Sequence, residues 1–409
     1  MWLYNICIYF YFGCIALASG WYLKARLWRE ERRNLFARMS AAIAPGDRII
    51  WIHASSLGEF EQGRPVIESI RKQRPHHKIL VTFFSPSGYE IRKNYDGADY
   101  IFCIPADTPA NVRRFLDAAH PETAIFVKSE FWLNMLAELH RRNIPAHIIS
   151  AVFRPGSIFF RPCGGPYRRA LRNFRSIFVQ DKESAELLKK IGIADAVVAG
   201  DTRFDRVTEI ASQAGKIDVI GRFKGSSRLF IAGSTWAPDE QILLPLINGN
   251  RNIKFIVAPH EMDRQRINAL CRSIEGGAVC YTECQPETDF SGIQVLVLDT
   301  VGLLAPAYGY ASWGYIGGGF GVGIHNTLEA AAFGLPVAFG PNYRKFREAC
   351  DLIAIGAAAS VKNFNQLDEW FAPLRDDEKH LLETGTKARR YTESRKGATA
   401  AIVGSIFGK

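Results

Sequence analysis

RIIWIHASSLGEF, residues 48–60, is the stretch that best indicates the fold. Its first half is an almost unbroken apolar run, which is typical of a strand covered on both faces of a parallel sheet. Small residues and Gly58 then lead into a segment of helical period, residues 61–73. The stretch therefore predicts one strand–turn–helix unit of an α/β fold.

The same unit recurs along the first half of the chain. Further strands are expected at 78–84, 99–104, 123–128, 146–150, 176–180 and 196–200, and further helices at 109–119, 131–142 and 182–191. Apolar strands joined by crossover helices predict a parallel sheet with helices on both faces.

A second series of strands follows a polar, Gly- and Ser-containing stretch. These strands are expected at 228–234, 252–260, 293–299, 313–318 and 336–340. We therefore predict two doubly wound, Rossmann-like domains that face a cleft, at 24–210 and 228–409, joined by a linker at 211–227. No sequence repeat of 20–50 residues occurs, which excludes a solenoid.

The charge of the chain is concentrated in two places. The formal net charge of the 409 residues is +10, and two segments, 24–38 and 151–180, together account for all of it. Residues 151–180 contain six arginines and no acid. Two local basic patches indicate specific anionic partners and not non-specific binding of nucleic acid. The eight cysteines form no C-x-x-C pair, so we expect neither a metal site nor a disulfide framework. We expect the chain to reside in a reducing compartment.

Residues 1–23 contain no charged side chain. A helix of that length crosses a hydrocarbon core of about 30 Å, and aromatic residues at both ends favour the membrane interface. The cations that follow place the remainder of the chain in the cytoplasm. We therefore expect a retained transmembrane anchor, and the alternatives are a cleaved signal peptide or a helix buried in the fold.

Two loops of the first half carry candidate catalytic groups. Glu59 falls at the start of the helix that follows the first strand, although an acidic residue there is also stabilised by the helix dipole. Glu130 lies in Lys128-Ser129-Glu130-Phe131-Trp132, where the alternative is a Ser129 cap with Glu130 in the first helical turn. The arginines after residue 151 suit bidentate recognition of phosphate, and their alternative role is a solvated basic loop.

The second half contains the Gly-rich stretch GGGFGVGIHNTLEAAA, residues 317–332. A strand, a Gly-rich loop and a helix start predict a phosphate cradle. The stretch contains neither G-x-G-x-x-G nor a P-loop, so a dinucleotide-binding dehydrogenase and a P-loop ATPase are not supported. Glu329, one turn into the helix, is a candidate contact of ribose hydroxyls.

Taken together, these motifs resemble those of the 3-deoxy-D-manno-octulosonic acid (Kdo) transferase family, which transfers Kdo from CMP-Kdo to a lipid A precursor. The resemblance runs over most of the chain and is carried by Ser56-Leu57-Gly58-Glu59, residues 129–134, residues 200–205, residues 232–235, Ala258-Pro259-His260-Glu261 with Arg264, and His325-Asn326 with Glu329. The chain departs from the family pattern at Lys128, where an acidic residue is usual, and at Leu133, where proline is common. These departures concern mainly the acceptor side.

The resemblance implies a GT-B glycosyltransferase that inverts the anomeric centre and needs no metal or cofactor. It also implies a single-pass protein of the bacterial inner membrane with its catalytic domains in the cytoplasm. It implies Glu59 as general base and Glu130 as a supporting carboxylate. Donor-binding candidates are Ser234, Pro259, His260, Arg264, Gly321, Gly323, His325, Asn326, Thr327 and Glu329. Acceptor-binding candidates are Ser56, Gly58, Lys128, Arg154, Arg161, Arg168 and Arg169. The alternatives are another GT-B transferase with a UDP-sugar donor and a non-catalytic, membrane-anchored nucleotide-sugar binder.

Overall fold

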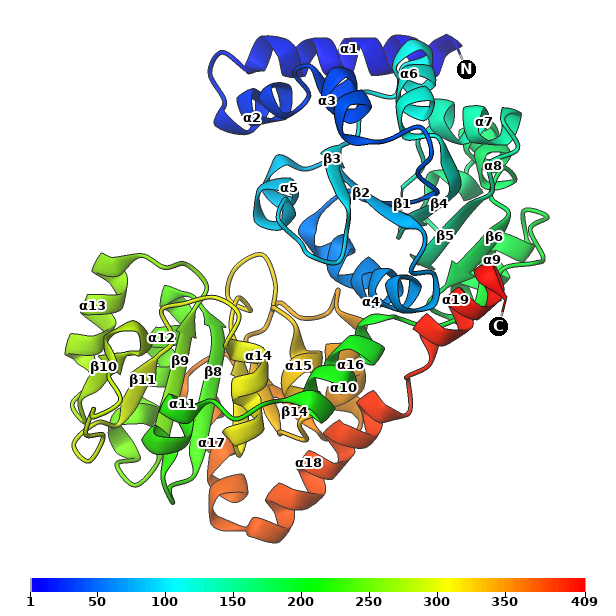
Figure 1. Cartoon of the computed structure of the whole chain (residues 1–409). Coiled ribbons are helices and arrows are strands. Elements are labelled where there is room, and N and C mark those ends of the chain that lie inside the picture. Colours follow the sequence, from blue (N-terminus) through cyan, green and yellow to red (C-terminus); the bar gives the residue numbers. More distant parts are fainter. Residues whose placement is uncertain (1, 129, 409) are drawn as a thin grey trace. The chain divides into compact units, whose positions relative to one another are not determined.

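The computed structural model describes residues 2–128 and 130–408. The chain forms two compact units, Met1–Asp205 with Lys396–Lys409, and Arg206–Arg395. Each unit has a parallel sheet with helices on both of its faces (Figure 1).

The sheet of the first unit has the order β3-β2-β1-β4-β5-β6-β7, and all of its strand pairs are parallel. Its strands are β1 (Ile49–Ala54), β2 (Lys78–Phe83), β3 (Tyr100–Cys103), β4 (Pro121–Val127), β5 (Ala146–Ala151), β6 (Ser176–Val179) and β7 (Val197–Val198). Its helices after the N-terminal pair are α3 (Leu35–Ala42), α4 (Leu57–Gln73), α5 (Pro86–Arg92), α6 (Pro109–Ala119), α7 (Leu133–Arg141), η1 (Ile158–Phe160), η2 (Pro162–Gly164), α8 (Gly165–Leu171), α9 (Lys182–Lys189) and α19 (Ala398–Phe407).

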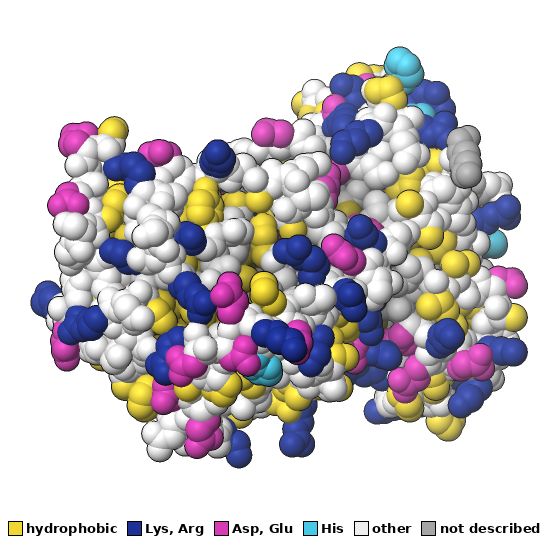
Figure 2. All heavy atoms as spheres, turned by 90° about the horizontal axis from the view of Figure 1, so that it is seen from below, with side chains coloured by type: hydrophobic (Ala, Val, Ile, Leu, Met, Phe, Trp, Pro, Cys, Tyr) yellow, Lys and Arg dark blue, Asp and Glu magenta, His cyan; other side chains and the backbone are white. Residues whose placement is uncertain are grey.

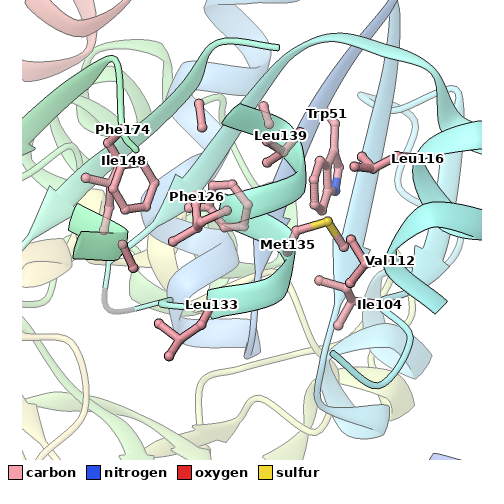
Figure 3. Packing of buried hydrophobic residues seen from close by; sticks show 14 of the residues in the cluster. Trp51, Ile104, Val112, Leu116, Phe126, Leu133, Met135, Leu139, Ile148 and Phe174 are labelled. Carbon is pink, nitrogen blue, oxygen red and sulfur yellow. The ribbon is translucent and has the colours of Figure 1, made fainter. Parts of the chain in front are cut away.

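The largest core cluster of the first unit lies between the sheet and α6 and α7 (Figure 3). Trp51 of β1 and Phe126 of β4 are fully buried there, with ring centroids 5.2 Å apart. The indole of Trp51 donates a hydrogen bond of 2.8 Å to Thr82 Oγ1, so its polar atom is paired inside the core. This packing fixes β1, β2 and β4 side by side.

The second unit repeats the arrangement with the order β10-β11-β9-β8-β12-β13-β14, again entirely parallel. Its strands are β8 (Leu229–Thr235), β9 (Lys254–Pro259), β10 (Ala278–Cys280), β11 (Val295–Val297), β12 (Trp313–Ile316), β13 (Val337–Phe339) and β14 (Ala358–Ser360). Its helices include α12 (Ala237–Gly249), α13 (Arg264–Ser273), η3 (Tyr281–Glu283), α14 (Leu304–Ala307), η4 (Tyr308–Tyr310), α15 (Thr327–Ala332), α16 (Arg347–Ala354), α17 (Phe364–Asp376) and α18 (Glu378–Glu393).

The expected linker at 211–227 is largely helical in the structure. Helix α10 (Arg203–Gln213) extends into it, and α11 (Asp218–Lys224) occupies much of the remainder. Ile220 and Phe223 of α11 are buried in a core cluster of the second unit, so this segment is part of that unit. The stretch predicts a linker because it is rich in Gly and Ser, and that composition gives no weight to these two apolar residues.

The expected second domain, 228–409, ends earlier in the structure, because residues 396–409 group with the first unit. Helix α19 packs on α4, and its Ile402 and Val403 are completely buried in a cluster that includes β1 and β2 side chains. Asp205 accepts hydrogen bonds from the backbone N–H of Gly397 (2.6 Å) and Thr399 (2.7 Å), which fixes the start of α19.

The N-terminal segment forms two helices, α1 (Trp2–Ala18) and α2 (Leu23–Glu31), in place of the single spanning helix expected over 1–23. Among the described residues, no single helix is both long and apolar enough to cross a membrane. Helices α1 and α2 meet that criterion only as a pair, and they are bent by 114° at their junction.

Basic and acidic side chains are mixed on the surface of the molecule that Figure 2 shows. On the face shown in Figure 2, basic and acidic side chains alternate without a large region of one sign.

Candidate active site and donor site

The candidate carboxylates follow two strands at the topological switch point of the first sheet. Glu59 comes after β1 and Glu130 after β4, and these two strands are hydrogen-bonded neighbours. In doubly wound sheets, ligands bind outside the carboxyl ends of the strands at the position where the strand order reverses. The topology therefore brings both expected carboxylates to the edge where a site is expected.

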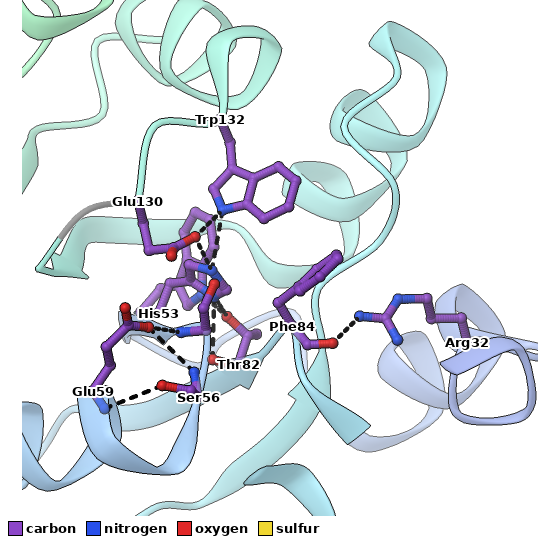
Figure 4. Close-up of polar contacts among 10 residues, drawn as sticks. Arg32, His53, Ser56, Glu59, Thr82, Phe84, Glu130 and Trp132 are labelled. Carbon is purple, nitrogen blue, oxygen red and sulfur yellow. Dashed lines mark hydrogen bonds and ion pairs between the residues drawn. The ribbon is translucent and has the colours of Figure 1, made fainter. Parts of the chain in front are cut away.

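Glu59 closes a capping box at the start of α4 (Figure 4). Its Oε2 accepts hydrogen bonds from the backbone N–H of Ser55 (2.8 Å) and Ser56 (3.2 Å), and the Ser56 hydroxyl accepts from the Glu59 N–H (3.4 Å). The helix-stabilising role considered for Glu59 is thus present in the structure. In the described part of the chain, these contacts involve Oε2, and Oε1 has no hydrogen bond.

Glu130 lies in a buried polar network (Figure 4). Its Oε2 accepts a hydrogen bond of 2.8 Å from the Trp132 indole and lies 3.5 Å from His53 Nε2. The other ring nitrogen of His53 contacts Thr82 Oγ1 at 2.9 Å and the Thr82 carbonyl at 3.2 Å. His53 is completely buried on β1 and was not among the expected site residues.

The two carboxylates have opposite pKa shifts. Burial and the negative charge of Glu130 raise the pKa of Glu59. Burial also acts to raise the pKa of Glu130, but hydrogen bonding and the charge of His53 outweigh it and hold that pKa below its usual value. A carboxylate pair separated in this way gives one group that is more basic than an ordinary carboxylate and one that stays ionised.

The remaining acceptor-side candidates occupy the same edge of the sheet. Lys128 directly follows β4 and has φ 68°, a left-handed conformation that is uncommon for a side-chain-bearing residue. Ser129, expected to cap a helix from residue 130, lies outside the described residues, and α7 begins at Leu133. Ser56 is the N-cap of α4, and a Cβ at Gly58 would meet open space, so packing does not require glycine there.

The arginine-rich segment folds over an aromatic cluster that includes Phe131 and Phe159, with centroids 4.6 Å apart. Arg168 is engaged within this segment, because its Nη1 donates hydrogen bonds of 2.9 Å to the carbonyls of Phe159 and Arg161. The other acceptor candidates are exposed, and within the described residues their side chains have no hydrogen-bond or ion-pair partner; they are Arg154, Arg161 and Arg169. Their guanidinium groups are therefore the ones available to a ligand.

The donor-side candidates gather at the corresponding switch point of the second sheet, between β8 and β12. Ser234, at the end of β8, adopts φ 54°. Beyond it, three rings stack: Trp236 on His260 (centroids 4.8 Å apart) and His260 on His325 (4.3 Å). The Trp236 indole lies 3.3 Å from His325 Nε2 and donates to it. Burial and the neighbouring His260 lower the pKa of His325 to about 4, so this ring is neutral at pH 7.

The Gly-rich loop after β12 is fixed by Asp239, a buried residue of α12 that was not among the expected site residues. Its carboxylate accepts from the backbone N–H of Gly318 (2.9 Å), the N–H of Trp236 (2.9 Å) and the Tyr315 hydroxyl (2.8 Å). A Cβ on Gly319 would lie 2.5 Å from Gly340 Cα, so the loop can only lie this close to the β13 end with glycine.

Other expected donor residues lie in the Gly-rich loop and at the start of α15. Asn326 caps the short helix α15 through the Leu328 N–H (3.1 Å) and donates to Glu329 Oε1 (3.0 Å), which positions that carboxylate. Gly323 adopts φ 145°, and Gly321 is exposed in the same loop. The Thr327 hydroxyl is buried and has no partner among the described residues.

Arg264 is the first residue of α13, and its side chain lies near two acidic side chains. Its Nη1 is 3.7 Å from both Glu283 and Asp299, and its side chain is exposed. Pro259 ends β9 and is buried, while the next N–H, that of His260, donates to the Thr235 carbonyl at 2.9 Å. His260 is thereby held against β8, where it stacks on Trp236.

Comparison with known proteins identifies the relationship. A family model described as 3-Deoxy-D-manno-octulosonic-acid transferase (kdotransferase) matches residues 27–206. The 3-deoxy-D-manno-octulosonic acid transferase of Bordetella pertussis is 26% identical and aligns over 93% of this chain and 94% of its own length. The transferase of that name from Aquifex aeolicus is 25% identical over 83% of this chain and 88% of its own. The chain is therefore similar to Kdo transferases over most of its length.

These relatives are named as Kdo transferases, a glycosyltransferase enzyme family, as expected from the motifs of this chain. Its fold is similar to that of UDP-GlcNAc 2-epimerase from Neisseria meningitidis, with a TM-score of 0.61, 15% identity, and coverage of 88% of this chain and all of the other. Two parallel α/β units of the kind found in GT-B glycosyltransferases are thus confirmed.

Proposed function

We propose that the enzyme transfers Kdo from CMP-Kdo to a lipid A precursor with inversion of the anomeric centre, and that Glu59 is the general base. The observation that carries the proposal is the pair of carboxylates at the β1–β4 switch point with pKa values shifted in opposite directions. An inverting transfer needs one base for the acceptor proton, and a raised carboxylate pKa suits that task.

In the proposed step, an acceptor hydroxyl oxygen attacks the anomeric carbon of Kdo from the face opposite CMP. Glu59 takes the hydroxyl proton as the new carbon–oxygen bond forms, and the bond to the CMP phosphate oxygen breaks with its electron pair. CMP leaves as an anion, so the step requires no strong general acid. Glu130, kept ionised by His53, positions the site and keeps the pKa of Glu59 high.

The second unit supports the donor half of the proposal. The stack of Trp236, His260 and His325 offers aromatic faces to a nucleobase, because base–aromatic stacking needs only a π face. Backbone N–H groups of the Gly-rich loop, together with Arg264, are the proposed partners of the phosphate, and Glu329 of the ribose. The family resemblance implies that no metal or cofactor takes part.

The acceptor half rests on the basic segment of the first unit. Arg154, Arg161 and Arg169 have exposed guanidinium groups, which bind phosphate esters well. We propose that they, with Lys128, contact the phosphates of the lipid A precursor at the cytoplasmic face of the bacterial inner membrane. Arg168 contributes indirectly by holding the loop.

The test is incubation of the full-length enzyme in membranes with labelled CMP-Kdo and a tetraacylated lipid A precursor, beside UDP-GlcNAc as a competing donor. We expect label to enter the lipid from CMP-Kdo alone, with the opposite anomeric configuration in the product. Transfer from UDP-GlcNAc, or binding of CMP-Kdo without any transfer, contradicts the proposal.

A further inference from the structure

The Gly-rich loop of the second unit, residues 317–323, is held on one side by the turn at residues 341–346, which follows β13. The backbone N–H of Asn342 donates a 2.9 Å hydrogen bond to the Gly319 carbonyl. The Asn342 side chain donates a second hydrogen bond, of 2.7 Å, to the Gly321 carbonyl. Asn342 therefore fixes the direction of two peptide groups of the loop, although it was not among the expected donor-binding residues.

Lys345, in the same turn, holds the end of the loop. Its ammonium group donates a hydrogen bond to the Val322 carbonyl. Its side chain also lies against Gly323, where a Cβ would be 2.6 Å from Lys345 Cε. Within the described chain, the Lys345 ammonium has no acidic partner. Its charge is therefore placed at the loop and is not neutralised by an ion pair.

These contacts decide where the loop points its backbone N–H groups. In a trans peptide the N–H lies on the side opposite the carbonyl of the preceding residue, and the described chain contains no cis peptide bond. The carbonyls of Gly319, Gly321 and Val322 face the turn, so the N–H groups that follow them point away from it; they belong to Phe320, Val322 and Gly323. Among the described residues, no acceptor is bound to these three N–H groups. The loop therefore presents three unpaired donors on its far side.

The loop begins against the ring stack of Trp236, His260 and His325. A Cβ on Gly318 would lie 3.0 Å from His325 Cδ2, so no side chain separates the start of the loop from that ring. Unpaired backbone N–H groups in a loop bind anionic oxygens, and aromatic faces bind nucleobases. The stack and the loop together match the two ends of one nucleotide.

We propose that Asn342 and Lys345 are positioning residues for the phosphate of the nucleotide donor, because they turn the three N–H groups of the loop toward it. The inference deepens the proposed function and rests on it for the identity of the donor. Negative charge develops on this phosphate as the nucleotide leaves, so donors that are fixed in advance stabilise the transition state as well as the bound donor.

The test compares the binding of CMP with that of cytidine, which has no phosphate, by NMR titration of the full-length protein. Asn342→Ala removes a donor to the loop without changing the charge, and Lys345→Met removes a donor together with a charge. The matched control is Arg344→Met, since the exposed Arg344 side chain has no hydrogen-bond or ion-pair partner in the part of the chain that the structure describes. We expect the affinity for CMP to fall about tenfold in Asn342→Ala and in Lys345→Met. The affinity for cytidine should stay at its wild-type value in both, and Arg344→Met should bind both ligands like the wild type.

Three results overturn the positioning role. Equal losses of CMP and cytidine affinity mean that the turn supports the folding of the second unit and not the phosphate alone. A loss in Lys345→Met with wild-type binding in Asn342→Ala means that charge acts without positioning. An equal loss of CMP affinity in Arg344→Met and Lys345→Met means that any cation of this turn has the same effect.

A wrong donor assignment gives a different result from a wrong positioning role. The wild-type protein is also titrated with UDP and with uridine. Binding of UDP without binding of CMP refutes the proposed donor, and the same variants are then compared on UDP and uridine. If the wild type binds neither nucleotide more tightly than its nucleoside, the loop does not hold a phosphate and the positioning role is refuted.

Discussion

Replacing Glu59 with glutamine separates its catalytic role from its role in the helix cap. The glutamine carbonyl oxygen can accept from the same N–H groups, those of Ser55 at 2.8 Å and Ser56 at 3.2 Å, so the capping box keeps its geometry. What is lost is a negative charge at the helix N-terminus, which is worth about 0.3–1 kcal/mol. A change of this size lowers the Tm by no more than about 4 °C in a chain of this kind.

The expected effect on turnover is far larger. Removal of a general base costs about 10²- to 10⁴-fold, which corresponds to about 2.7–5.4 kcal/mol in the activation barrier. The matched control is Glu61→Gln on the same helix, whose carboxylate pairs with Arg92 at 2.6 Å. Single-turnover transfer from labelled CMP-Kdo, CMP binding by calorimetry and thermal unfolding are measured on both variants.

Glu59→Gln must lose turnover, keep CMP affinity and unfold within a few degrees of the wild type, while Glu61→Gln keeps turnover. If Glu59→Gln transfers Kdo as fast as Glu61→Gln, the base is another group. If it unfolds much earlier than the wild type, the residue is mainly structural and the assignment fails.

Three further predictions concern other charged groups. Because Glu59 must be ionised to act as base, kcat/KM should fall with decreasing pH through its raised pKa, and Glu130→Gln should move this fall to lower pH in a pH–rate profile; an unmoved profile contradicts the coupling. His147 is buried with a pKa of about 4, below the usual 6.5, so unfolding takes up a proton between those values. The free energy of unfolding should drop by up to about 3 kcal/mol as pH falls across that window, and urea denaturation of His147→Gln should show a smaller drop. Arg161→Gln/Arg169→Gln should raise the KM for a bisphosphorylated acceptor about tenfold and leave the KM for CMP-Kdo unchanged; an equal rise with a dephosphorylated acceptor refutes the phosphate contact.

The sequence predicts the order of strands and helices well, because fully covered parallel strands read as unbroken apolar runs. Every expected strand overlaps an observed one. The short strands β10 (Ala278–Cys280) and β14 (Ala358–Ser360) were missed, since three residues at the ends of a sheet leave no pattern to recognise. The packing of α19 on the first unit was also missed. Apolar periodicity shows that one face of a helix is buried, but it does not show which part of the chain buries it.

The candidate site is predicted less completely than the fold. Glu59 and Glu130 could be selected as candidates because each follows a strand, and their roles were assigned from the family resemblance. His53 and Asp239 could not, since a single polar residue in an apolar run or a first helical turn is common, and their roles depend on partners distant in the chain. The position of His53 inside an otherwise apolar strand is the one sequence signal of this network, and it does not identify the partners.

The position of α19 has a consequence for biosynthesis of the protein. Ile402 and Val403 fill the hydrophobic cluster against α4, so the first unit lacks part of its interior until the ribosome has translated almost the entire chain. During translation, the second unit, Arg206–Arg395, is complete first, and the nascent first unit exposes the apolar seat of α19. Shortened chains that stop before residue 396 should therefore be recognised by chaperones and proteases, whatever the state of their catalytic residues.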